Sequence, residues 1–292
     1  MEQKWVYIDG EFYKKDEAKV SVFDHGYLYG DGVFEGIRAY NGRVFRCEEH
    51  IDRLYDAAKA LALEIPMTKE ELIEAMLATI RKNQLRDCYI RLVVSRGKGD
   101  LGVNPNKCKR PTIVIITDKI EMYPPEMYKK GMKAITASTR RNMPGVLDPQ
   151  IKSLNYLNNI LAKIEANHAG ASEAIMLNQN GLVTECTGDN IFIVKDGVLM
   201  TPPIYVGALD GITRRTVISL AEKLDIPFKE KELTLFNVYG ADECFFTGTA
   251  AELIAVTEID NRIIGDGQCG PITARLLEEY QKVARSEGRE IY

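Results

Sequence analysis

The sequence is poor in residues that bind metals or form disulfides. Its 292 residues include three histidines, at His25, His50 and His168, and six cysteines with no Cys-x-x-Cys pair. Zinc and iron–sulfur sites need several such ligands at close spacing, so we expect no metal centre. The cysteines are expected to be reduced structural thiols, and they are Cys47, Cys88, Cys108, Cys186, Cys244 and Cys269.

Long apolar runs and a strong net charge are also missing. The first segment, "MEQKWVYIDGEFYKKDEAKV", has no apolar run long enough for a signal peptide, and no later stretch approaches membrane-spanning length. The formal charge of −4 is too small to indicate a nucleic-acid or anionic membrane surface. We therefore expect a cytoplasmic protein that binds small molecules, with neither nucleic acid nor membrane as a partner.

The remaining composition is that of an ordinary globular protein, with 45% hydrophobic and 27% charged residues. The length exceeds the usual size of a single core, which favours two domains. Asp9-Gly10 and Asn41-Gly42 are strong turn pairs between β-like segments and predict two hairpins near the N-terminus. Helices are predicted over 48–62 and after Thr68, and strands over 88–95 and 111–117.

A proline-containing segment separates the two expected domains. "KIEMYPPEMYKK", residues 119–130, has a Pro-Pro pair and no sustained periodicity, which is typical of a linker. We expect a small α+β domain at 1–118 and a larger one at 131–292, both built mostly from antiparallel hairpins and packed helices. The second domain is predicted to contain a strand at 133–138, a helix from Lys152 to Gly170, hairpins turning at 178–181 and 195–197, and helices from Gly211 and after Pro271.

Lys152, in "LDPQIKSLNYLNNILAK", is unusual for its predicted position. Leu154, Leu157, Leu161 and Ile164 recur after it at helical spacing, so we expect Lys152 at the entrance of a helix. Helix starts favour acidic side chains, and a lysine there is electrostatically unfavourable. Most lysines are solvated. A buried lysine, however, favours its neutral amine and can form a Schiff base with a carbonyl.

Two other side chains extend this hypothesis. Tyr156, four residues after Lys152, lies near the same side of the expected helix, where its phenol is useful to an imine-forming amine. Glu185, in "LVTECTGDNIFIV", interrupts a strand of apolar and β-branched residues. The simpler interpretation is an outward-facing glutamate. If Glu185 faces inward it requires a cationic partner, such as a protonated ring nitrogen, because an unpaired buried carboxylate is strongly disfavoured.

Two short segments offer backbone N–H groups to an anion. "LDGITRR" starts a helix at Gly211, so the N–H groups of Ile212 and Thr213 and the Thr213 hydroxyl lie at its positive end. Ordinary helix capping by Thr213 explains the same pattern. "FFTGTAAEL" contains a second small-residue turn, which indicates little in isolation. The residues of that turn are Gly248, Thr249 and Ala250.

The strand "CYIRLVV" places Tyr89, Arg91 and Val93 on one face. A phenol and a guanidinium that point together can bind a carboxylate, although a half-exposed strand with a polar face has the same pattern. The following "RGKGDLGVNP", residues 96–105, is glycine-rich but matches neither the dinucleotide fingerprint nor a P-loop. We interpret it as a mobile loop over a site.

Together these features are what a pyridoxal phosphate enzyme needs. Seven segments in order, "YGDGVFEGIRAY", "FRCEEHIDRL", "YIRLVV" with "GDLGVNP", "IKSLNYLNN", "ECTGDNIF", "ALDGITR" and "FFTGTAAE", resemble the fold-type IV aminotransferases, specifically the branched-chain amino acid aminotransferases. The resemblance runs from about residue 5 to residue 275. It implies a two-domain α+β fold with pyridoxal 5′-phosphate at the domain interface, and a homo-oligomer with the dimer as its minimal unit, up to a hexamer.

The resemblance also implies roles for individual residues. Lys152 would form the Schiff base with the cofactor and then move the proton between the amino acid's α-carbon and C4′ of the cofactor. Glu185 would keep the pyridine nitrogen protonated, and Tyr156 would hydrogen-bond the ring oxygen. The other positions that match cofactor-binding residues of the family are Arg53, Gly188, Leu209, Gly211, Ile212, Thr213, Gly248 and Thr249.

For Arg53, the helical pattern and the family resemblance predict different environments. On the predicted helix it projects opposite the stripe that contains Ile51, Leu54 and Tyr55, and Glu49 one turn earlier offers a routine surface pair. The pattern therefore predicts an exposed arginine. The match of "HIDRL" to the family motif instead implies a phosphate ligand.

For the substrate, the resemblance implies an apolar pocket completed by a second subunit. Tyr89 would meet the α-carboxylate together with the N–H groups of Thr249 and Ala250, and Arg91 with Tyr29 would take the side-chain carboxylate of glutamate or 2-oxoglutarate. The family has a linker tyrosine near this pocket, for which Tyr123 and Tyr128 are both candidates. The pocket residues are Phe34, Gly36, Tyr156, Thr249 and Ala250, with Tyr29, Leu101 and Val103 from the neighbouring subunit.

The resemblance thus predicts reversible transamination between L-leucine, L-isoleucine or L-valine and 2-oxoglutarate, by a ping-pong cycle through pyridoxamine phosphate. D-amino acid aminotransferases, (R)-amine transaminases and aminodeoxychorismate lyases share the lysine, the glutamate and the phosphate turns. "YIR" followed by "GVNP" favours the branched-chain group. Alternatives of another class are a non-catalytic protein that only binds pyridoxal phosphate, and a Schiff-base lyase or aldolase without a cofactor, which would leave Glu185 unused.

Overall fold

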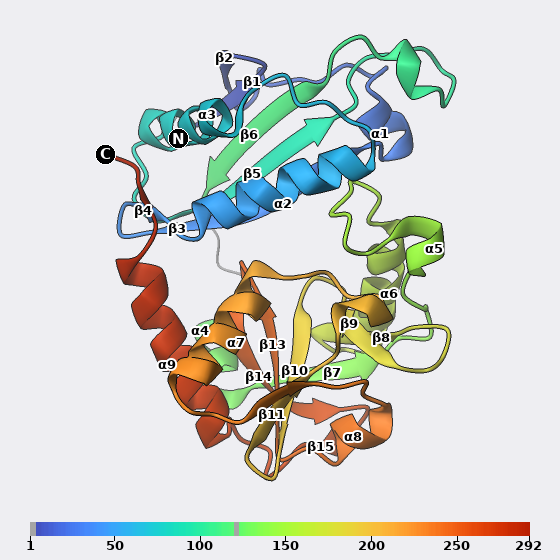
Figure 1. Cartoon of the computed structure of the whole chain (residues 1–292), viewed down its shortest axis with the longest axis vertical. Helices are drawn as coiled ribbons and strands as arrows, with labels where there is room; N and C mark the ends of the chain where they lie inside the picture. Colours follow the sequence, from blue (N-terminus) through green and yellow to red (C-terminus); the bar gives the residue numbers. More distant parts are fainter. Residues whose placement is uncertain (1–3, 120–122) are drawn as a thin grey trace. The chain divides into compact units, whose positions relative to one another are not determined.

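The computed structural model describes residues 4–119 and 123–292, and the chain forms two compact units (Figure 1). One unit comprises Met1–Ile120, Ile151–Tyr156 and Ala284–Tyr292, and the other comprises Glu121–Gln150 and Leu157–Val283. The chain therefore returns twice to the first unit after leaving it. A division at a single linker, as predicted from the sequence, does not capture these two returns.

Within the described residues the first unit contains a seven-stranded antiparallel sheet with strand order β16-β4-β3-β5-β6-β1-β2. The hairpins predicted at Asp9-Gly10 and Asn41-Gly42 are confirmed as β1–β2 and β3–β4. The strands are β1 (Trp5–Ile8), β2 (Glu11–Lys14), β3 (Gly32–Tyr40), β4 (Arg43–Val44), β5 (Cys88–Ser95), β6 (Thr112–Asp118) and β16 (Arg289–Glu290), and the helices are α1 (His25–Tyr29), α2 (Cys47–Ala60), α3 (Lys69–Lys82) and the short 3₁₀ turn Pro105–Lys107.

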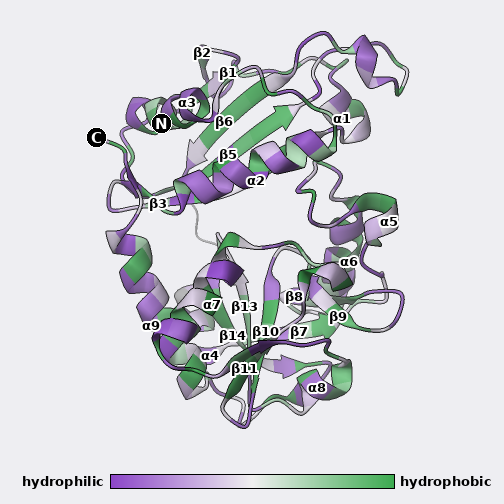
Figure 2. Cartoon of the chain, viewed as in Figure 1, coloured by the Kyte–Doolittle hydropathy of each residue, from purple (hydrophilic) through white to green (hydrophobic). Residues whose placement is uncertain are grey.

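One face of this sheet packs against α2 and α3, and the other carries Tyr89 and Arg91. Ile90, Leu92 and Val94 of β5 are fully buried in a core with the apolar residues of both helices, and Figure 2 shows apolar residues concentrated in β5 and β6. The alternating burial of β5 turns Tyr89, Arg91 and Val93 to the opposite face, as predicted from their spacing. The capping box of Thr68 and Glu71 is present at the start of α3.

Two helices in the first half of the chain were not predicted from the sequence. Residues 25–29, which lie between the two predicted hairpins, form α1, which begins where the Asp24 side chain accepts a hydrogen bond from the Gly26 N–H at 2.7 Å. In the predicted linker, Pro125–Lys130 forms helix α4 of the second unit, with proline in its first turn, where the missing N–H is tolerated. Residues 120–122 of that linker lie outside the described residues.

The second unit contains a nine-stranded sheet in the described residues, with order β12-β11-β10-β13-β14-β7-β8-β9 and β15 paired to β14. Most pairs are antiparallel, and β11–β12, β14–β7 and β7–β8 are parallel. Its strands are β7 (Met132–Thr136), β8 (Glu173–Leu177), β9 (Val183–Cys186), β10 (Asn190–Lys195), β11 (Val198–Thr201), β12 (Phe228–Glu230), β13 (Glu243–Gly248), β14 (Glu252–Ile259) and β15 (Arg262–Ile263), and its helices include α5 (Pro144–Leu147), α6 (Leu157–His168), α7 (Ile212–Lys223), α8 (Leu235–Tyr239), most of α9 (Pro271–Ser286) and the 3₁₀ turn Ile204–Val206.

Helix α6 differs from its prediction in both its start and its buried face. It begins at Leu157, so Lys152 is not at a helix entrance. The apolar residues that predicted the helix are exposed, with Leu157 61%, Leu161 47% and Ile164 42% accessible. The buried face instead carries Ala162 and Ala166, because small side chains let the helix lie close to β8.

The described residues contain no helix long and apolar enough to cross a membrane. They also contain no group of three or more histidine, cysteine, aspartate or glutamate side chains arranged to hold a metal ion. All six cysteines are free thiols, and Cys47, Cys88, Cys186 and Cys244 are buried.

Candidate active site

Lys152 is positioned by strand β3 through backbone hydrogen bonds. The Phe34 N–H donates to the Lys152 carbonyl at 3.0 Å, and the Leu154 N–H donates to the Gly32 carbonyl at 2.8 Å. An antiparallel bridge between Val33 and Ser153 lies between these two bonds. Residues 152–154 thus form a short extended segment on the edge of β3, which fixes the base of the lysine side chain without a helix.

The Lys152 amine lies among aromatic side chains. Its Nζ donates to the Tyr156 hydroxyl at 3.2 Å and lies 4.6 Å from the centre of the Phe34 ring. The Phe34 and Tyr156 rings meet edge to face with centroids 5.0 Å apart. The lysine and the phenol were predicted to be close through one helical turn, and they are close here because both belong to the irregular segment before α6.

Arg91 and Tyr89 lie on the same sheet face as Phe34. The Arg91 guanidinium carbon is 4.6 Å from the Phe34 ring centre and 5.5 Å from that of Tyr89. Gly36 pairs with Arg91 across the β3–β5 ladder, and a Cβ at Gly36 would fall 2.2 Å from the Tyr89 hydroxyl oxygen. Any larger residue there would force the phenol to move. Burial raises the pKa of Tyr89, so its hydroxyl stays a donor at neutral pH.

Arg53 is not exposed, contrary to the prediction from helical periodicity. Its side chain is 10% accessible and forms a two-pronged ion pair with Glu35 of β3, with Nε to Oε1 at 2.7 Å and Nη2 to Oε2 at 2.8 Å. Glu49, expected to be its surface partner, pairs with Arg46 instead. The signal missed in the sequence is Glu35 itself, a glutamate within the otherwise apolar start of β3.

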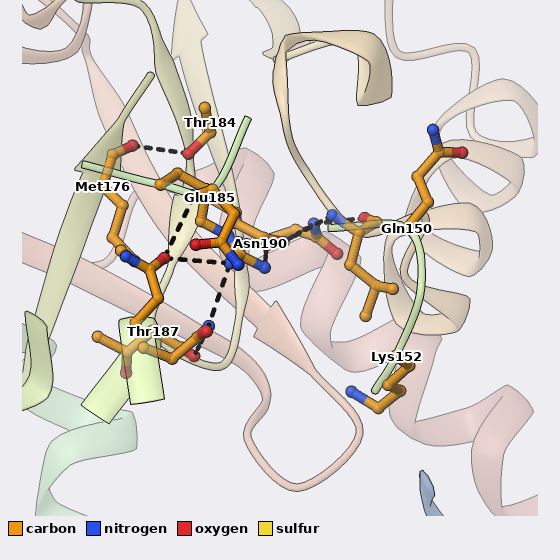
Figure 3. A network of polar contacts seen from close by, with 12 residues as sticks. Gln150, Lys152, Met176, Thr184, Glu185, Thr187 and Asn190 are labelled. Carbon is orange, nitrogen blue, oxygen red and sulfur yellow. Dashed lines mark hydrogen bonds and ion pairs between the residues drawn. The ribbon is translucent and has the colours of Figure 1, made fainter. Parts of the chain in front are cut away.

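Glu185 faces inward, and its cationic partner is a residue that the sequence did not identify. The carboxylate is about 6% accessible, and its Oε1 accepts from Arg141 Nε at 2.9 Å and Nη2 at 2.8 Å. Its Oε2 accepts from the Leu209 N–H at 2.9 Å and, at 3.3 Å, from Asn190 Nδ2. Figure 3 shows this network of polar contacts around Glu185 and Asn190.

Asn190 joins Glu185 to the segment that precedes α7. Its Nδ2 also donates to the Leu209 carbonyl at 2.9 Å. A Cβ at Gly211 would fall 2.1 Å from the Asn190 Oδ1, so this position requires glycine. The Asn190 side chain thus connects Glu185 to residues 209–211. Asn190 was not predicted as a site residue from the sequence.

The start of α7 presents N–H groups that no side chain caps. Gly211 is the N-cap, no side-chain cap bond is formed, and the first turn has no acidic residue. The expected capping by Thr213 is therefore absent, and Ile212 and Thr213 are both buried. An uncapped helix start with a partial positive charge favours an anion.

The second predicted anion turn follows β13 in the same unit. Thr249 and Ala250 form the half-buried turn between β13 and β14. A Cβ at Gly248 would fall 1.9 Å from Asp189 Oδ1, so the strand end approaches the 188–190 segment closely. At Gly188, by contrast, a Cβ would meet no atom within 4 Å, so packing of the protein alone does not require glycine at that position.

Residues predicted to come from a neighbouring subunit are exposed in this chain. Tyr29 on α1 donates its hydroxyl to the Leu101 carbonyl, and Leu101 and Val103 are 70% and 78% accessible. Of the two linker tyrosines, Tyr128 donates to the Ala251 carbonyl at 3.0 Å. The Tyr123 hydroxyl is buried with no hydrogen-bond partner within the described ranges, and burial raises its pKa.

Comparison with known proteins identifies the family. A family model described as amino-transferase class IV matches residues 32–259. The chain belongs to the class IV aminotransferase family. A Methanocaldococcus jannaschii protein named "Putative branched-chain-amino-acid aminotransferase" is 56% identical, over 98% of this chain and 99% of that protein.

Solved structures of aminotransferases share the fold. The Escherichia coli branched-chain amino acid aminotransferase is 36% identical and superposes with a TM-score of 0.96, covering 99% of this chain and 100% of that one. The T.th. branched-chain amino acid aminotransferase, solved with pyridoxamine 5′-phosphate, is 40% identical with a TM-score of 0.93, covering 97% and 94%. The predicted α+β, fold-type IV architecture of this aminotransferase is therefore confirmed.

Proposed function

We propose that this aminotransferase uses pyridoxal 5′-phosphate to transfer the amino group between branched-chain L-amino acids and 2-oxoglutarate in a ping-pong cycle. The observation that carries the proposal is the Lys152 amine, hydrogen-bonded to Tyr156 at 3.2 Å on the sheet face that holds Tyr89 and Arg91. An amine that can form a Schiff base, beside donors for a carboxylate, is the minimum that amino-acid transamination requires. The branched-chain relatives at 36–56% identity support the substrate class.

Each unit, taken by itself, contains groups that suit a part of the cofactor. When bound, pyridoxal phosphate supplies an aldehyde for the lysine and a ring that withdraws electrons from the substrate. The uncapped start of α7, with the N–H groups of Ile212 and Thr213, suits the phosphate, as does the turn at Thr249. Gly188 and Leu209 would border the ring, and Gly188 leaves open space that the protein's own packing does not fill.

Each protein group has a separate task in the proposed reaction. Lys152 would hold the cofactor at its aldehyde and would move the substrate's proton, and its hydrogen bond to the Tyr156 hydroxyl orients the amine. Glu185 would hold the proton of the ring nitrogen. Arg141 and the Leu209 N–H hold that carboxylate in place, because both donate hydrogen bonds to it.

The proposed substrate site uses a charged and an apolar element together. Tyr89 donates to the α-carboxylate with the N–H groups of the 249–250 turn, while Arg91 binds the second carboxylate of 2-oxoglutarate. Between substrates, Arg91 rests over the Phe34 ring at 4.6 Å, where the cation is stabilised by the aromatic face. Phe34, Gly36 and Ala250 provide the apolar lining for leucine, isoleucine or valine.

Of the two linker tyrosines, Tyr123 is the better candidate for a contact with this pocket. Its buried hydroxyl has no hydrogen-bond partner in the part of the chain that the structure describes. The Tyr128 hydroxyl already donates to the Ala251 carbonyl. A ligand group would therefore satisfy Tyr123 without breaking an existing bond.

We propose that the chain is a cytoplasmic homo-oligomer. Leu157, Ile160, Leu161 and Ile164 form an exposed apolar stripe on α6, spaced as in helices that pack against another helix. Tyr29, Leu101 and Val103 form a second exposed group that would complete the pocket of a neighbouring copy. A cytoplasmic location is supported by the free state of all six cysteines.

The visible absorption spectrum of the purified protein tests the proposal. Reconstituted with pyridoxal phosphate, the protein should have a band of the lysine-bound cofactor that L-leucine, but not D-alanine, converts to the pyridoxamine form. Conversion by D-alanine alone would assign the protein to the D-amino acid group. No band after reconstitution would remove the role of Lys152, and a band that no amino acid changes would indicate a non-catalytic binder.

A further inference from the structure

Glu35 is a fully buried carboxylate that the proposed reaction does not use. It lies in β3 between Phe34 and Gly36, which face the side of the sheet that carries Arg91, and it points to the opposite side, under α2. Its Oε2 accepts from His50 Nδ1 at 2.8 Å and from Arg53 Nη2 at 2.8 Å, and its Oε1 accepts from Arg53 Nε at 2.7 Å.

This arrangement leaves the carboxylate no freedom to rotate. His50 is 2% accessible and Glu35 0%, so solvent competes for neither partner. The fork of Arg53 and the plane of the carboxylate match each other, which is the most direction-specific ion pair that side chains form. His50 secures the oxygen shared by both donors. The long and otherwise flexible Arg53 side chain is therefore held in one orientation by two residues on different elements.

Burial of a charge inside a core is costly unless it serves a purpose or is fully paired. Burial alone would raise the pKa of Glu35, but Arg53 and His50 outweigh it and hold that pKa well below its usual range. Burial lowers the pKa of the His50 imidazole, so the ring is a neutral donor at pH 7. The cluster thus contains one anion and one cation. The negative charge of Glu35 weakens the attraction of Arg53 for an anion, whereas its hydrogen bonds orient the guanidinium.

The same strand also holds Lys152. The N–H of Phe34, adjacent to Glu35, donates to the Lys152 carbonyl at 3.0 Å. One rigid strand therefore fixes the base of the lysine on one side and the head of Arg53 on the other. A cofactor held by an aldehyde at one end and a phosphate at the other needs these two groups at a constant separation.

We propose that Glu35, secured by His50, is a positioning residue that orients Arg53 for the phosphate of the cofactor. This inference rests on the proposed function, because it assigns the phosphate to Arg53. Without Glu35 the arginine keeps its charge but must be ordered each time an anion binds, and that ordering weakens phosphate binding. Pyridoxal, which has the aldehyde but no phosphate, should not depend on Glu35.

The test compares two ligands on the full-length chain freed of cofactor. Affinities for pyridoxal 5′-phosphate and for pyridoxal are measured by fluorescence titration in the wild type and in Glu35→Gln, with Glu48→Gln as a control at an exposed position of α2. We expect Glu35→Gln to lose at least tenfold in affinity for pyridoxal phosphate and less than threefold for pyridoxal, and Glu48→Gln to change neither. Equal losses for both ligands, or a gain for the phosphate, would overturn the proposal.

Two more variants separate orientation from charge and from folding. Glu35→Asp keeps the negative charge but shortens the reach, and Arg53→Lys keeps the positive charge but removes the fork. Both variants should lose the preference for pyridoxal phosphate over pyridoxal, as Glu35→Gln does. Both should keep the far-ultraviolet circular dichroism spectrum of the wild type, which shows that they fold. If Glu35→Gln does not fold, these two variants decide, and wild-type discrimination in both would overturn the proposal. A wild type that binds the two ligands equally would instead refute the phosphate assignment of the proposed function.

Discussion

Arg141 forms an ion pair with Glu185 in which two N–H groups donate to a single carboxylate oxygen, with Nε at 2.9 Å and Nη2 at 2.8 Å from Oε1. Both side chains are almost fully buried. The pair therefore holds the carboxylate in one orientation, and it leaves Oε2 to the Leu209 N–H.

Replacing Arg141 by Met should cost about 3–5 kcal/mol of folding stability, because it leaves a buried carboxylate without its cation. The double replacement Arg141→Met with Glu185→Met should recover most of that loss, since two apolar side chains of similar volume can replace a buried pair. Urea unfolding of the wild type and both variants measures these effects. A double variant no more stable than Arg141→Met would mean that the site does not behave as an isolated ion pair.

The strand patterns were predictable from the sequence, and the partners of the buried charges were not. Alternation in β5 correctly predicted that Tyr89 and Arg91 share a face, because that depends only on local geometry. Glu185 is separated from Arg141 by 44 positions and Glu35 from Arg53 by 18, and no local period connects such pairs. The resemblance to known motifs named Arg53 but did not name Glu35 or Arg141.

Lys152 and α6 show where helical periodicity misplaced a structural element. Apolar residues at helical spacing predicted a helix that starts at Lys152. The helix begins later, at Leu157, and turns its alanines to the core. Periodicity reveals that a helix has an apolar face but cannot tell whether that face meets its own chain or another one.

Lys152→Ala should abolish turnover while the chain keeps its fold and binds the cofactor weakly. The reaction needs an amine at this position to bind the aldehyde and to move the proton, and a positioned acid–base group contributes roughly 10²–10⁴-fold to rate. Tyr156→Phe, which removes only the hydroxyl 3.2 Å from Nζ, should reduce the rate less. Single-turnover absorbance changes with L-leucine measure both variants, and transamination retained by Lys152→Ala would remove the central assignment.

Arg91→Ala should impair 2-oxoglutarate more than leucine. The loss of a charge-assisted contact to the second carboxylate costs about 1.5–3 kcal/mol, or roughly one to two powers of ten in kcat/KM. Leucine has no second carboxylate and loses only the packing between Arg91 and Phe34. Half-reaction kinetics with each substrate separate the two effects, with Arg91→Lys as a control that retains charge. Equal losses for both substrates would show that Arg91 does not select the acidic one.

His50 should make folding stability depend on pH in the mildly acidic range. Burial lowers the pKa of His50, so below about pH 6.5 the unfolded chain takes up a proton that the folded chain refuses. The contribution of His50 to the free energy of unfolding is therefore fully present above that pH and falls as the pH decreases. The total loss is about 1.4 kcal/mol for each unit by which the pKa of His50 in the folded chain lies below that in the unfolded chain. Urea midpoints between pH 7.5 and 5.5 should decline in the wild type and change less in His50→Gln.

The exposed apolar stripe on α6 should be part of the interface through which the chain self-associates. Glutamate at Leu161 should weaken self-association by at least about 100-fold, roughly 2.8 kcal/mol, because a charge in the middle of an apolar interface is desolvated without a partner. Asn167→Glu adds the same charge at an exposed polar position of the same helix, beyond the C-terminal end of the stripe, and should weaken assembly much less. Light scattering across a dilution series distinguishes the two. Since the proposed pocket takes Tyr29 and Leu101 from a second copy, the dissociated Leu161→Glu chain should also lose leucine turnover at concentrations where the Asn167→Glu oligomer keeps it.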